Sequence, residues 1–324
     1  MLDLGIVIVN YNTRDLLREC LKSVYANKGD FSYEVCVVDN CSADGSCRMV
    51  RAEFPQVHLI ESPVNGGYAY ANNLGLRHFG FGQRTPDAER RTPNPEPRTP
   101  NAERRTPPCY ALLLNPDTEL PPTALADMLA FMDGHPDAGI AGPKLVRQDG
   151  SLDLACRRSF PSPEVSAYRM LGLSRLFPKS RRFGRYNLTC EDPDQLTEVD
   201  SVVGAFMMVR REAIEQAGLL DEAFFMYGED LDWAYRIKQH GWRVWYNPAV
   251  TVLHIKEAAS KHSHRARVEF WRAMSIFYHK HYAAETPRWQ HGLVLAGIAV
   301  FGRLDLWKRA LRSHSRRQQA QEAV

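Results

Sequence analysis

The segment YALLLNPD, residues 110–117, decides the fold class of this 324-residue chain. Four consecutive aliphatic residues are closed by Asn115, Pro116 and Asp117, which predicts a buried strand whose end projects a carboxylate into solvent. In open α/β sheets, ligands lie just outside the carboxyl ends of strands. Asp117 is therefore a candidate ligand for a hard divalent cation that would hold phosphate oxygens. In the alternative interpretation, Asp117 only caps the following turn.

The first 80 residues, ahead of this segment, alternate strand and helix patterns. We expect a helix after Asn12, with Asn12 as its cap, and a second helix after Gly66 and Gly67. Strands are expected at residues 5–9, 34–38 and 57–60. This alternation predicts a parallel sheet with helices on both of its faces.

Residues 84–107 interrupt the alternation with a seven-residue repeat that begins with Arg-Thr-Pro at positions 84, 91, 98 and 105. Proline recurs in every unit and no position is consistently apolar, so a coiled coil is excluded. The composition predicts an extended, disordered insertion into a complete domain.

The second half of the chain has less regular patterns. A helix at residues 123–132 and a strand at 139–141 precede a loop-dominated lobe at 161–198. Two strands are expected at 243–246 and 250–253. From about residue 266 the pattern is helical, aromatic and basic.

Composition limits the class of protein and its surroundings. The net charge of +3 gives no reason to expect a nucleic-acid partner. Seven cysteines without CxxC spacing fit a reducing cytosol and argue against a disulfide framework or a zinc site. The longest uncharged apolar run, residues 292–302, is far shorter than the roughly 20 residues that span a bilayer. We therefore expect a cytoplasmic protein, at most peripheral on the inner face of the membrane.

The C-terminal segment has the composition of an interfacial helix. Apolar side chains, among them Leu293 and Phe301, are followed by Lys308, Arg309, Arg312, Arg316 and Arg317. This order predicts attraction to an anionic membrane surface. The alternative is a helix packed on the main domain with a solvated basic end.

Two polar clusters in the first half could bind a nucleotide. Asp39, at the end of the second strand, can accept hydrogen bonds from a base or ribose. The alternative there is a helix cap that uses Ser42 or Asp44. Asn65, Gly66 and Gly67 precede a helix of small residues, so their backbone can approach a diphosphate at a helix N-terminus.

Two features of the second half could take part in catalysis. Glu229, Asp230 and Asp232 follow an aromatic run, and their mutual repulsion and partial desolvation would raise a carboxylate pKa towards that of a general base. The alternative is ordinary enrichment of acids in a first helical turn. His254 ends a strand, as Asp117 does, and is a second candidate metal ligand.

Together these motifs resemble one family in their types and in their order. The set reads IVIVNYN (6–12), VVDNCSADGS (37–46), NGGYAYANNLG (65–75), LLLNPDTEL (112–120), VVGAFMMVRREA (202–213), LLDEAFFMYGEDLDWAYRIKQHGWRV (219–244) and LH (253–254). It is similar to the family 2 nucleotide-sugar glycosyltransferases, and within them to bacterial rhamnosyltransferase-like enzymes of cell-surface polysaccharide assembly. The resemblance covers residues 3–282 apart from the insert.

The resemblance implies an α/β architecture, the GT-A fold, with a Rossmann-like, mostly parallel sheet flanked by helices. It implies a domain at residues 1–265, interrupted by the insert at 84–107, with a nucleotide half (1–120) and an acceptor half (121–265). Residues 266–324 would form a helical, basic C-terminal segment.

The resemblance also implies roles for individual residues. Asp230 would be the catalytic base with Glu229 beside it, and Asp232 is the competing base. Asp117 and His254 would hold Mg²⁺ or Mn²⁺. The donor would be bound by Asn10, Tyr11, Asp39, Asn65, Gly66, Gly67, Asn72 and Asn115, the last standing where the family's metal motif has its first acid.

The implied reaction is the inverting transfer of a single sugar, rhamnose in the most similar enzymes. The donor would be a nucleoside-diphosphate sugar, and the acceptor a hydroxyl of a saccharide or lipid-linked saccharide in cell-surface polysaccharide biosynthesis. The QxxRW motif of processive members is not reproduced at residues 239–242, which favours single addition. A sugar-phosphate nucleotidyltransferase would need a basic glycine-rich loop where residues 10–13 stand. A non-catalytic surface-binding or scaffold protein would be expected to lose Asp39, Asp117, Glu229 and Asp230.

Overall fold

Two parallel, fully buried strands form the centre of the molecule. The computed structural model describes residues 2–82, 105–255, 264–303 and 305. Strands β1 (Leu4–Asn10) and β4 (Tyr110–Leu114) pair in parallel, and every one of their residues is buried. Strands covered on both faces are continuously apolar rather than alternating, which is why these two runs carry no polar residue before their ends. The prediction of a buried strand at residues 110–114 is confirmed.

The described strands form one nine-stranded sheet in the order β3-β2-β1-β4-β8-β6-β9-β5, with β7 paired to β9. The pairs β1–β2, β2–β3, β1–β4 and β6–β9 are parallel, whereas β8 is antiparallel to both of its neighbours. The other strands are β2 (Tyr33–Asp39), β3 (His58–Glu61), β5 (Thr118–Glu119), β6 (Ala138–Val146), β7 (Thr197–Val199), β8 (Phe206–Arg210) and β9 (Arg243–His254).

The chain reverses direction across the sheet between β1 and β4. It runs outward from β1 to β2 and β3, then returns past them to β4 on the other side of β1. Crossovers of parallel strands are right-handed, so α1 (Arg14–Ala26) and α2 (Ser46–Glu53) share one face while α3 (Tyr68–His78) covers the other. Ligands of open α/β sheets bind at such a switch point. This places the expected site at the carboxyl ends of β1 and β4.

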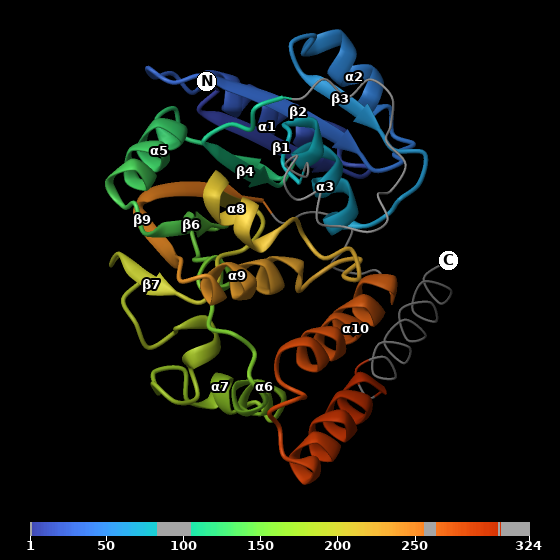
Figure 1. The fold of residues 1–324 in the computed structure, drawn as a ribbon, viewed down its shortest axis with the longest axis vertical. Helices are drawn as coiled ribbons and strands as arrows, with labels where there is room; N and C mark the ends of the chain where they lie inside the picture. Colours follow the sequence, from blue (N-terminus) through green and yellow to red (C-terminus); the bar gives the residue numbers. More distant parts are fainter. Residues whose placement is uncertain (1, 83–104, 256–263, 304, 306–324) are drawn as a thin grey trace, which may run out of the picture.

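Helices of the second half cover the antiparallel part of the sheet. The helices are α5 (Ala124–Gly134), α6 (Pro163–Met170), α7 (Leu173–Leu176), α8 (Arg211–Ala217), α9 (Glu229–Gln239) and α10 (His264–His281), with short 3₁₀ turns at Leu154–Cys156 and Arg185–Asn187. A further helix covers residues 288–303. Phe277 and Ala273 of α10 pack on Leu231 of α9 and on Phe224. Figure 1 shows α2 at one end of the molecule, and α6, α7 and the start of the last helix at the other.

Two expectations from the sequence require correction. Helix α1 is preceded by Thr13 as its cap; Asn12 adopts a positive φ of 53°, and its side chain accepts from the Ala43 N–H instead. The two strands expected at 243–246 and 250–253 are one strand, β9, with a register shift against β6 between them. The lobe at 161–198 is mostly loop, as expected, and it contains the short helices α6 and α7, with α6 capped by the Ser162 hydroxyl.

The Arg-Thr-Pro repeat lies outside the described residues except for its last three, 105–107. The basic positions 308–317 of the C-terminal segment also lie outside them. In the part of the chain that the structure describes, no helix is long and apolar enough to cross a membrane.

Candidate functional site

The carboxyl ends of β1 and β2 form a closed hydrogen-bond network. Asn10 is opposite Asp39 in the strand register, and its Nδ2 donates to Asp39 Oδ2 at 2.8 Å and to Ser42 Oγ at 3.0 Å. The Ser42 N–H donates to Asp39 Oδ1 at 2.8 Å, and the Thr13 hydroxyl donates to Asn10 Oδ1. Asp39 is buried, so it fixes the loop while retaining lone pairs on each carboxylate oxygen. Tyr11, next to this network, is exposed and could stack on a base.

The loop before α3 is attached to the same edge through Asn40. Asn40 Nδ2 donates to Asn65 Oδ1 at 3.0 Å, and the Gly66 N–H donates to Asn40 Oδ1 at 3.0 Å. Gly67 has φ 92°, and a Cβ there would lie 2.3 Å from the backbone oxygen of Phe225. Only glycine therefore allows this loop to approach the segment that leads into α9. The structure thus places Asn65, Gly66 and Gly67 beside Asp39.

Asn72 and Asn115, two other residues predicted to bind the sugar donor, have different surroundings. Asn72 is buried in α3, where its Nδ2 donates to the Tyr68 carbonyl, and its Oδ1 has no hydrogen-bond partner among the described residues. Asn115 follows β4, and its N–H donates to the Ala205 carbonyl at 3.0 Å. Asn72 therefore supports the first turn of α3, whereas Asn115 leaves its amide side chain at the strand end.

A chain of three side chains connects the end of β4 to the end of β9. His254 Nδ1–H donates to Asp153 Oδ2 at 2.8 Å, and His254 Nε2 lies 3.4 Å from Asp117 Oδ1. All three groups are buried, so the expectation that the Asp117 carboxylate projects into solvent is wrong. Burial alone would lower the pKa of His254, but the hydrogen bonds to Asp117 and Asp153 outweigh it and raise that pKa. Asp153 also fixes the imidazole with Nε2 towards Asp117.

This arrangement fits a divalent cation. With Nδ1–H given to Asp153, a neutral His254 presents the Nε2 lone pair to a carboxylate oxygen, and two facing lone pairs need a proton or a cation between them. A carboxylate that orients a metal-binding histidine is a common second partner at metal sites. Mn²⁺ accepts both oxygen and imidazole ligands, whereas Mg²⁺ prefers oxygen ligands. Among the described residues no cluster of three or more His, Cys, Asp or Glu could hold a metal ion, so the pair would need further oxygens from a ligand, Asn115 or water.

Asp230, in the first turn of α9, is held by a buried arginine. Arg158 Nη2 donates to Asp230 Oδ2 at 2.6 Å and to the Val202 carbonyl at 2.8 Å. The Gly204 N–H donates to the same Oδ2 at 3.2 Å, and the Leu231 N–H donates to Oδ1 at 2.8 Å. Burial would lower the pKa of Arg158, but Asp230 outweighs it and raises that pKa. Arg158 therefore keeps its positive charge in a buried position, directly against the Asp230 carboxylate.

Glu229 differs from its neighbour. It is buried, and its Oε2 has no hydrogen-bond partner among the residues described. Burial and the charge of Asp230 raise the pKa of Glu229 to about 8. Burial and the charges of Glu229 and Asp230 also raise the pKa of the Tyr68 phenol well above its usual value. Both Glu229 and Tyr68 therefore hold their protons more tightly than usual, next to the Asp230 carboxylate.

Asp232 is occupied by three basic groups. Its Oδ1 lies 2.8 Å from both Lys280 Nζ and His281 Nε2 of α10, and its Oδ2 accepts from Arg236 Nε at 2.9 Å. Burial would raise the pKa of Asp232, but these contacts lower it to about 2. Its exposed fraction is 0%, so a substrate hydroxyl has no access to it. This geometry favours Asp230 over Asp232 as a proton acceptor.

The backbone of Gly204 and Ala205 connects the two halves of the site. The Gly204 N–H donates to Asp230, and the Gly204 carbonyl accepts from the Tyr68 hydroxyl at 2.8 Å. The Ala205 carbonyl accepts from the Asn115 N–H, two residues before Asp117. The turn that carries Asp117 and the helix that carries Asp230 are therefore fixed to the same dipeptide.

Sequence reasoning missed four residues of this site: Asn40, Tyr68, Asp153 and Arg158. Asn40 and Tyr68 lie inside motifs that we quoted, so their position beside predicted residues was a usable signal. Asp153 and Arg158 lie in a stretch without periodicity, and nothing in the sequence distinguishes them from neighbouring charged residues.

Comparisons with known proteins agree with this geometry. The family model described as "Glycosyltransferase like family 2" matches residues 3–269. An N-acetylglucosaminyl-diphospho-decaprenol L-rhamnosyltransferase of Mycobacterium tuberculosis is 28% identical over 253 residues, which are 78% of this chain and 76% of that protein. The hexosyltransferase Agl10 of low-salt glycan biosynthesis in Haloferax volcanii is 25% identical over 252 residues, 78% and 67% of the two chains. The rhamnosyltransferase WbbL of Escherichia coli is 24% identical over 253 residues, 77% and 82%.

Solved structures show the same fold. A mannosyltransferase of Pyrobaculum calidifontis, in complex with GDP-mannose and Mn²⁺, superposes with a TM-score of 0.53 at 17% identity, covering 95% of this chain and 73% of that one. GalNAc-T7 with UDP, GalNAc and Mn²⁺ gives a TM-score of 0.55 at 14% identity, covering 89% and 52%. The predicted GT-A fold is confirmed by this likeness.

Proposed function

This chain belongs to the glycosyltransferase-like family 2, and from that premise we propose that it transfers a single sugar with inversion, in a metal-dependent reaction. The donor is a nucleoside-diphosphate sugar, and the acceptor is a hydroxyl of a saccharide or lipid-linked saccharide in polysaccharide biosynthesis. Rhamnose is the sugar that the names of two relatives favour. The observation that carries the proposal is the attachment of the Asp117 turn and Asp230 to one dipeptide, Gly204-Ala205.

The strand-end network supplies the donor site in this proposal. Asp39 accepts hydrogen bonds from the base or ribose, and Tyr11 covers the base. The backbone of Asn65, Gly66 and Gly67, at the N-terminus of α3, faces the diphosphate. Asp117 and His254 hold Mg²⁺ or Mn²⁺, with Asn115 beside them. When bound, the cation supplies charge stabilisation for the departing nucleoside diphosphate.

The first turn of α9 supplies the acid–base chemistry. Asp230 takes the proton of the acceptor hydroxyl while Arg158 and the Gly204 N–H hold its carboxylate in place. The hydroxyl oxygen forms a bond to the anomeric carbon on the face opposite the leaving group, and the bond to the diphosphate oxygen breaks. A single displacement of this kind inverts the anomeric configuration. The protonated Glu229 positions the acceptor by donating a hydrogen bond.

A panel of nucleotide sugars, assayed for hydrolysis and transfer with Mn²⁺ and with EDTA, tests the proposal. We expect one donor to be consumed only when the cation is present, and Asp117→Ala to abolish this cation-dependent donor binding. His254→Ala should weaken it. The proposal fails if no nucleotide sugar is bound, and the metal assignment fails if the nucleoside diphosphate binds equally well in EDTA.

The division into a nucleotide half (1–120) and an acceptor half (121–265) belongs to the same proposal. Contact of the C-terminal segment (266–324) with an anionic membrane is also part of the proposal. Most of the basic residues concerned lie beyond the described part of the chain.

A further inference from the structure

The most exposed apolar side chains of the described residues gather on two elements. Among the large apolar residues, the four highest exposed fractions belong to Leu176 (69%), Trp289 (67%), Leu171 (65%) and Leu293 (65%). Leu171 lies between α6 and α7, Leu176 is the last residue of α7, and Trp289 and Leu293 lie on the helix over residues 288–303. Both elements lie at the end of the molecule opposite α2 (Figure 1). Exposed apolar side chains that cluster in this way mark an interaction surface.

The part of this surface around α7 is also strongly basic. We call residues 171–182 the basic-apolar segment; its last eight residues, 175–182, read RLFPKSRR. From Val165 to Cys190 the chain contains six Lys or Arg and no Asp or Glu. Arg175, Lys179 and Arg181 are exposed, and none of the described residues forms an ion pair with them. The positive charge of the segment is therefore available to a partner.

The segment is held in shape by its own packing. Phe177, which is 48% exposed, keeps one side of its ring against Phe183 at a centroid distance of 5.7 Å. The Thr189 hydroxyl donates to the Pro178 carbonyl at 2.6 Å, and the Gly184 N–H donates to the Ser180 carbonyl at 2.8 Å. These contacts hold the loop in a shape that exposes Leu176 and Phe177 to solvent, although neither side chain joins a hydrophobic core. The exposure of these two side chains is therefore a property of the folded structure.

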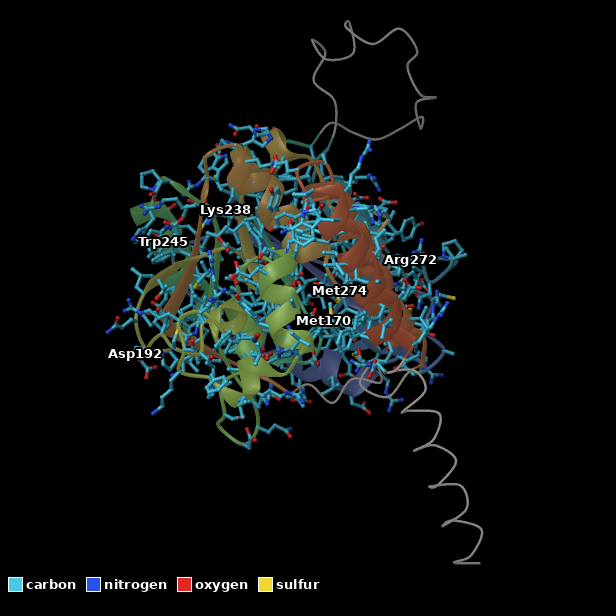
Figure 2. The ribbon with its side chains drawn as sticks, turned by 90° about the horizontal axis from the view of Figure 1, so that it is seen from below. Met170, Asp192, Lys238, Trp245, Arg272 and Met274 are labelled. Atoms are coloured by element: carbon cyan, nitrogen blue, oxygen red, sulfur yellow. The ribbon has the colours of Figure 1, made fainter. Side chains whose placement is uncertain are left out.

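Phosphate-binding groups converge next to these apolar side chains. One small cavity is lined by Arg181, Arg182 and Arg185 together with Glu164, Val165 and Tyr168. Arg182 is engaged by Glu164 and by the Tyr168 hydroxyl, to which its Nε donates at 2.6 Å, whereas Arg181 and Arg185 have no ion pair among the described residues. Guanidinium groups match phosphate oxygens in geometry and charge. Figure 2 views the molecule from this end. In this view Met170, at the end of α6, lies near Met274 of α10, and Arg272 of the same helix lies further out.

We propose that the basic-apolar segment, residues 171–182, is a docking surface for an anionic lipid bilayer. Leu171, Leu176 and Phe177 enter the boundary between headgroups and acyl chains, and the surrounding cations contact lipid phosphates. A nucleic acid would engage the cations but would leave the aliphatic side chains without a partner, so the combination favours lipid. This surface is separate from the C-terminal basic positions and does not depend on the proposed sugar transfer.

Vesicle co-sedimentation of the full chain tests the proposal. The vesicles contain equal phosphatidylglycerol and phosphatidylcholine, or phosphatidylcholine alone. Each cation near an anionic leaflet is worth about fivefold in binding, so Arg175→Gln with Lys179→Gln should weaken binding about 30-fold. Its control, Lys28→Gln with Arg48→Gln, removes two exposed cations at other places and should change binding less than twofold. Circular dichroism melting checks that each variant is folded.

A second pair of variants tests the apolar part. Leu176→Ser with Phe177→Ser should weaken binding by about tenfold or more at both low and high salt, because loss of apolar burial is not screened. Leu196→Ser, which changes a side chain with an exposed fraction of 46% away from the segment, is the control. Equal binding to neutral and anionic vesicles would overturn the proposal. So would binding that changes only when Leu293 and Val300 of the last helix become serine, or segment variants that disrupt a dimer in ultracentrifugation while vesicle binding is retained.

Discussion

Polar side chains gather both in the strand-end loops and in the first turn of α9. The two regions differ in how far apart in the sequence their hydrogen-bonded residues lie. Asn10 donates to Asp39, 29 residues later, because β1 and β2 are consecutive strands of one unit. Asp230 is held by Arg158, 72 residues earlier, and Asp232 by residues of α10. Two acids two positions apart in one helix thus acquire different properties. Partners that are distant in the sequence thus give the two carboxylates different surroundings, and in the proposed mechanism this leaves Asp230 as the base.

The largest effect that can break this comparison is expected for Asp230→Asn. The substitution keeps the shape and removes the proton acceptor, so the turnover number should fall by about 10²–10⁴-fold. Donor affinity, measured by titration calorimetry, should stay near the wild-type value because the strand-end network does not include Asp230. Near-normal turnover in Asp230→Asn together with an inactive Asp232→Asn would transfer the base role to Asp232.

The second effect concerns the metal pair and its orienting carboxylate. Asp153→Ala leaves His254 free to rotate, and loss of such a partner typically costs 10–100-fold in metal affinity. Mn²⁺ binding followed by electron paramagnetic resonance measures this loss without any turnover. Asp149→Ala, in the same hairpin but bonded only to Ser151 among described contacts, is the control and should bind Mn²⁺ like the wild type. Unchanged Mn²⁺ affinity in Asp153→Ala would show that Asp153 has no orienting role.

The third effect separates stability from catalysis at Asp232. Asp232→Ala leaves Lys280, His281 and Arg236 without their shared acceptor, so we expect the free energy of unfolding to fall by about 2 kcal/mol. The folded-state pKa of Asp232 is lowered to about 2, so its contribution is present above about pH 4 and is lost as the pH falls towards 2. Urea unfolding at pH 7 and pH 2.5 should therefore show a smaller difference between the two proteins at the lower pH. An equal difference at both values would argue against the ion pairs as its cause.

The fourth effect has the opposite sign and belongs to Glu229. Its pKa is raised to about 8 in the folded chain, so the folded state holds this proton more tightly than the unfolded state. The stability that this proton gives is present below about pH 4.5 and is lost as the pH rises through about 8. Glutamine has no proton to lose, so the Glu229→Gln variant avoids this decrease in stability. Its free energy of unfolding relative to that of the wild type, measured by urea unfolding, should therefore increase between pH 5 and pH 8. Glu19→Gln, at an exposed position, should show no such trend.

The smallest effect is expected outside both regions. Deleting residues 84–104 should change the melting temperature by no more than a few degrees, because the repeat has no apolar positions with which to join a core and loop length has a weak effect on closure entropy. Donor binding should be nearly unchanged as well. A fall of many degrees in calorimetry would show that the insert contributes to the folded structure.

Much of the proposed donor site could be predicted because it depends on elements that follow one another in the chain. The buried runs of β1, β2 and β4, the helices between them and the polar residues at their ends follow from spacing along the chain. Where the prediction was wrong, a non-local contact had decided the outcome. Asn12 accepts from Ala43 rather than capping α1, and β9 stays continuous because β6 pairs along its length despite a register shift.

The sequence by itself determined the α/β class, the glycosyltransferase-like family and the identity of Asp39, Asp117, Asp230 and His254 as candidate site residues. These follow from motifs whose members are close in the chain. Three further features required the folded structure: β8 runs antiparallel between β4 and β6, Asp153 orients His254, and Arg158 holds the Asp230 carboxylate in a buried contact. The physical reason is that a buried charge is stable only beside its partner, and folding, not spacing along the chain, brings such partners together.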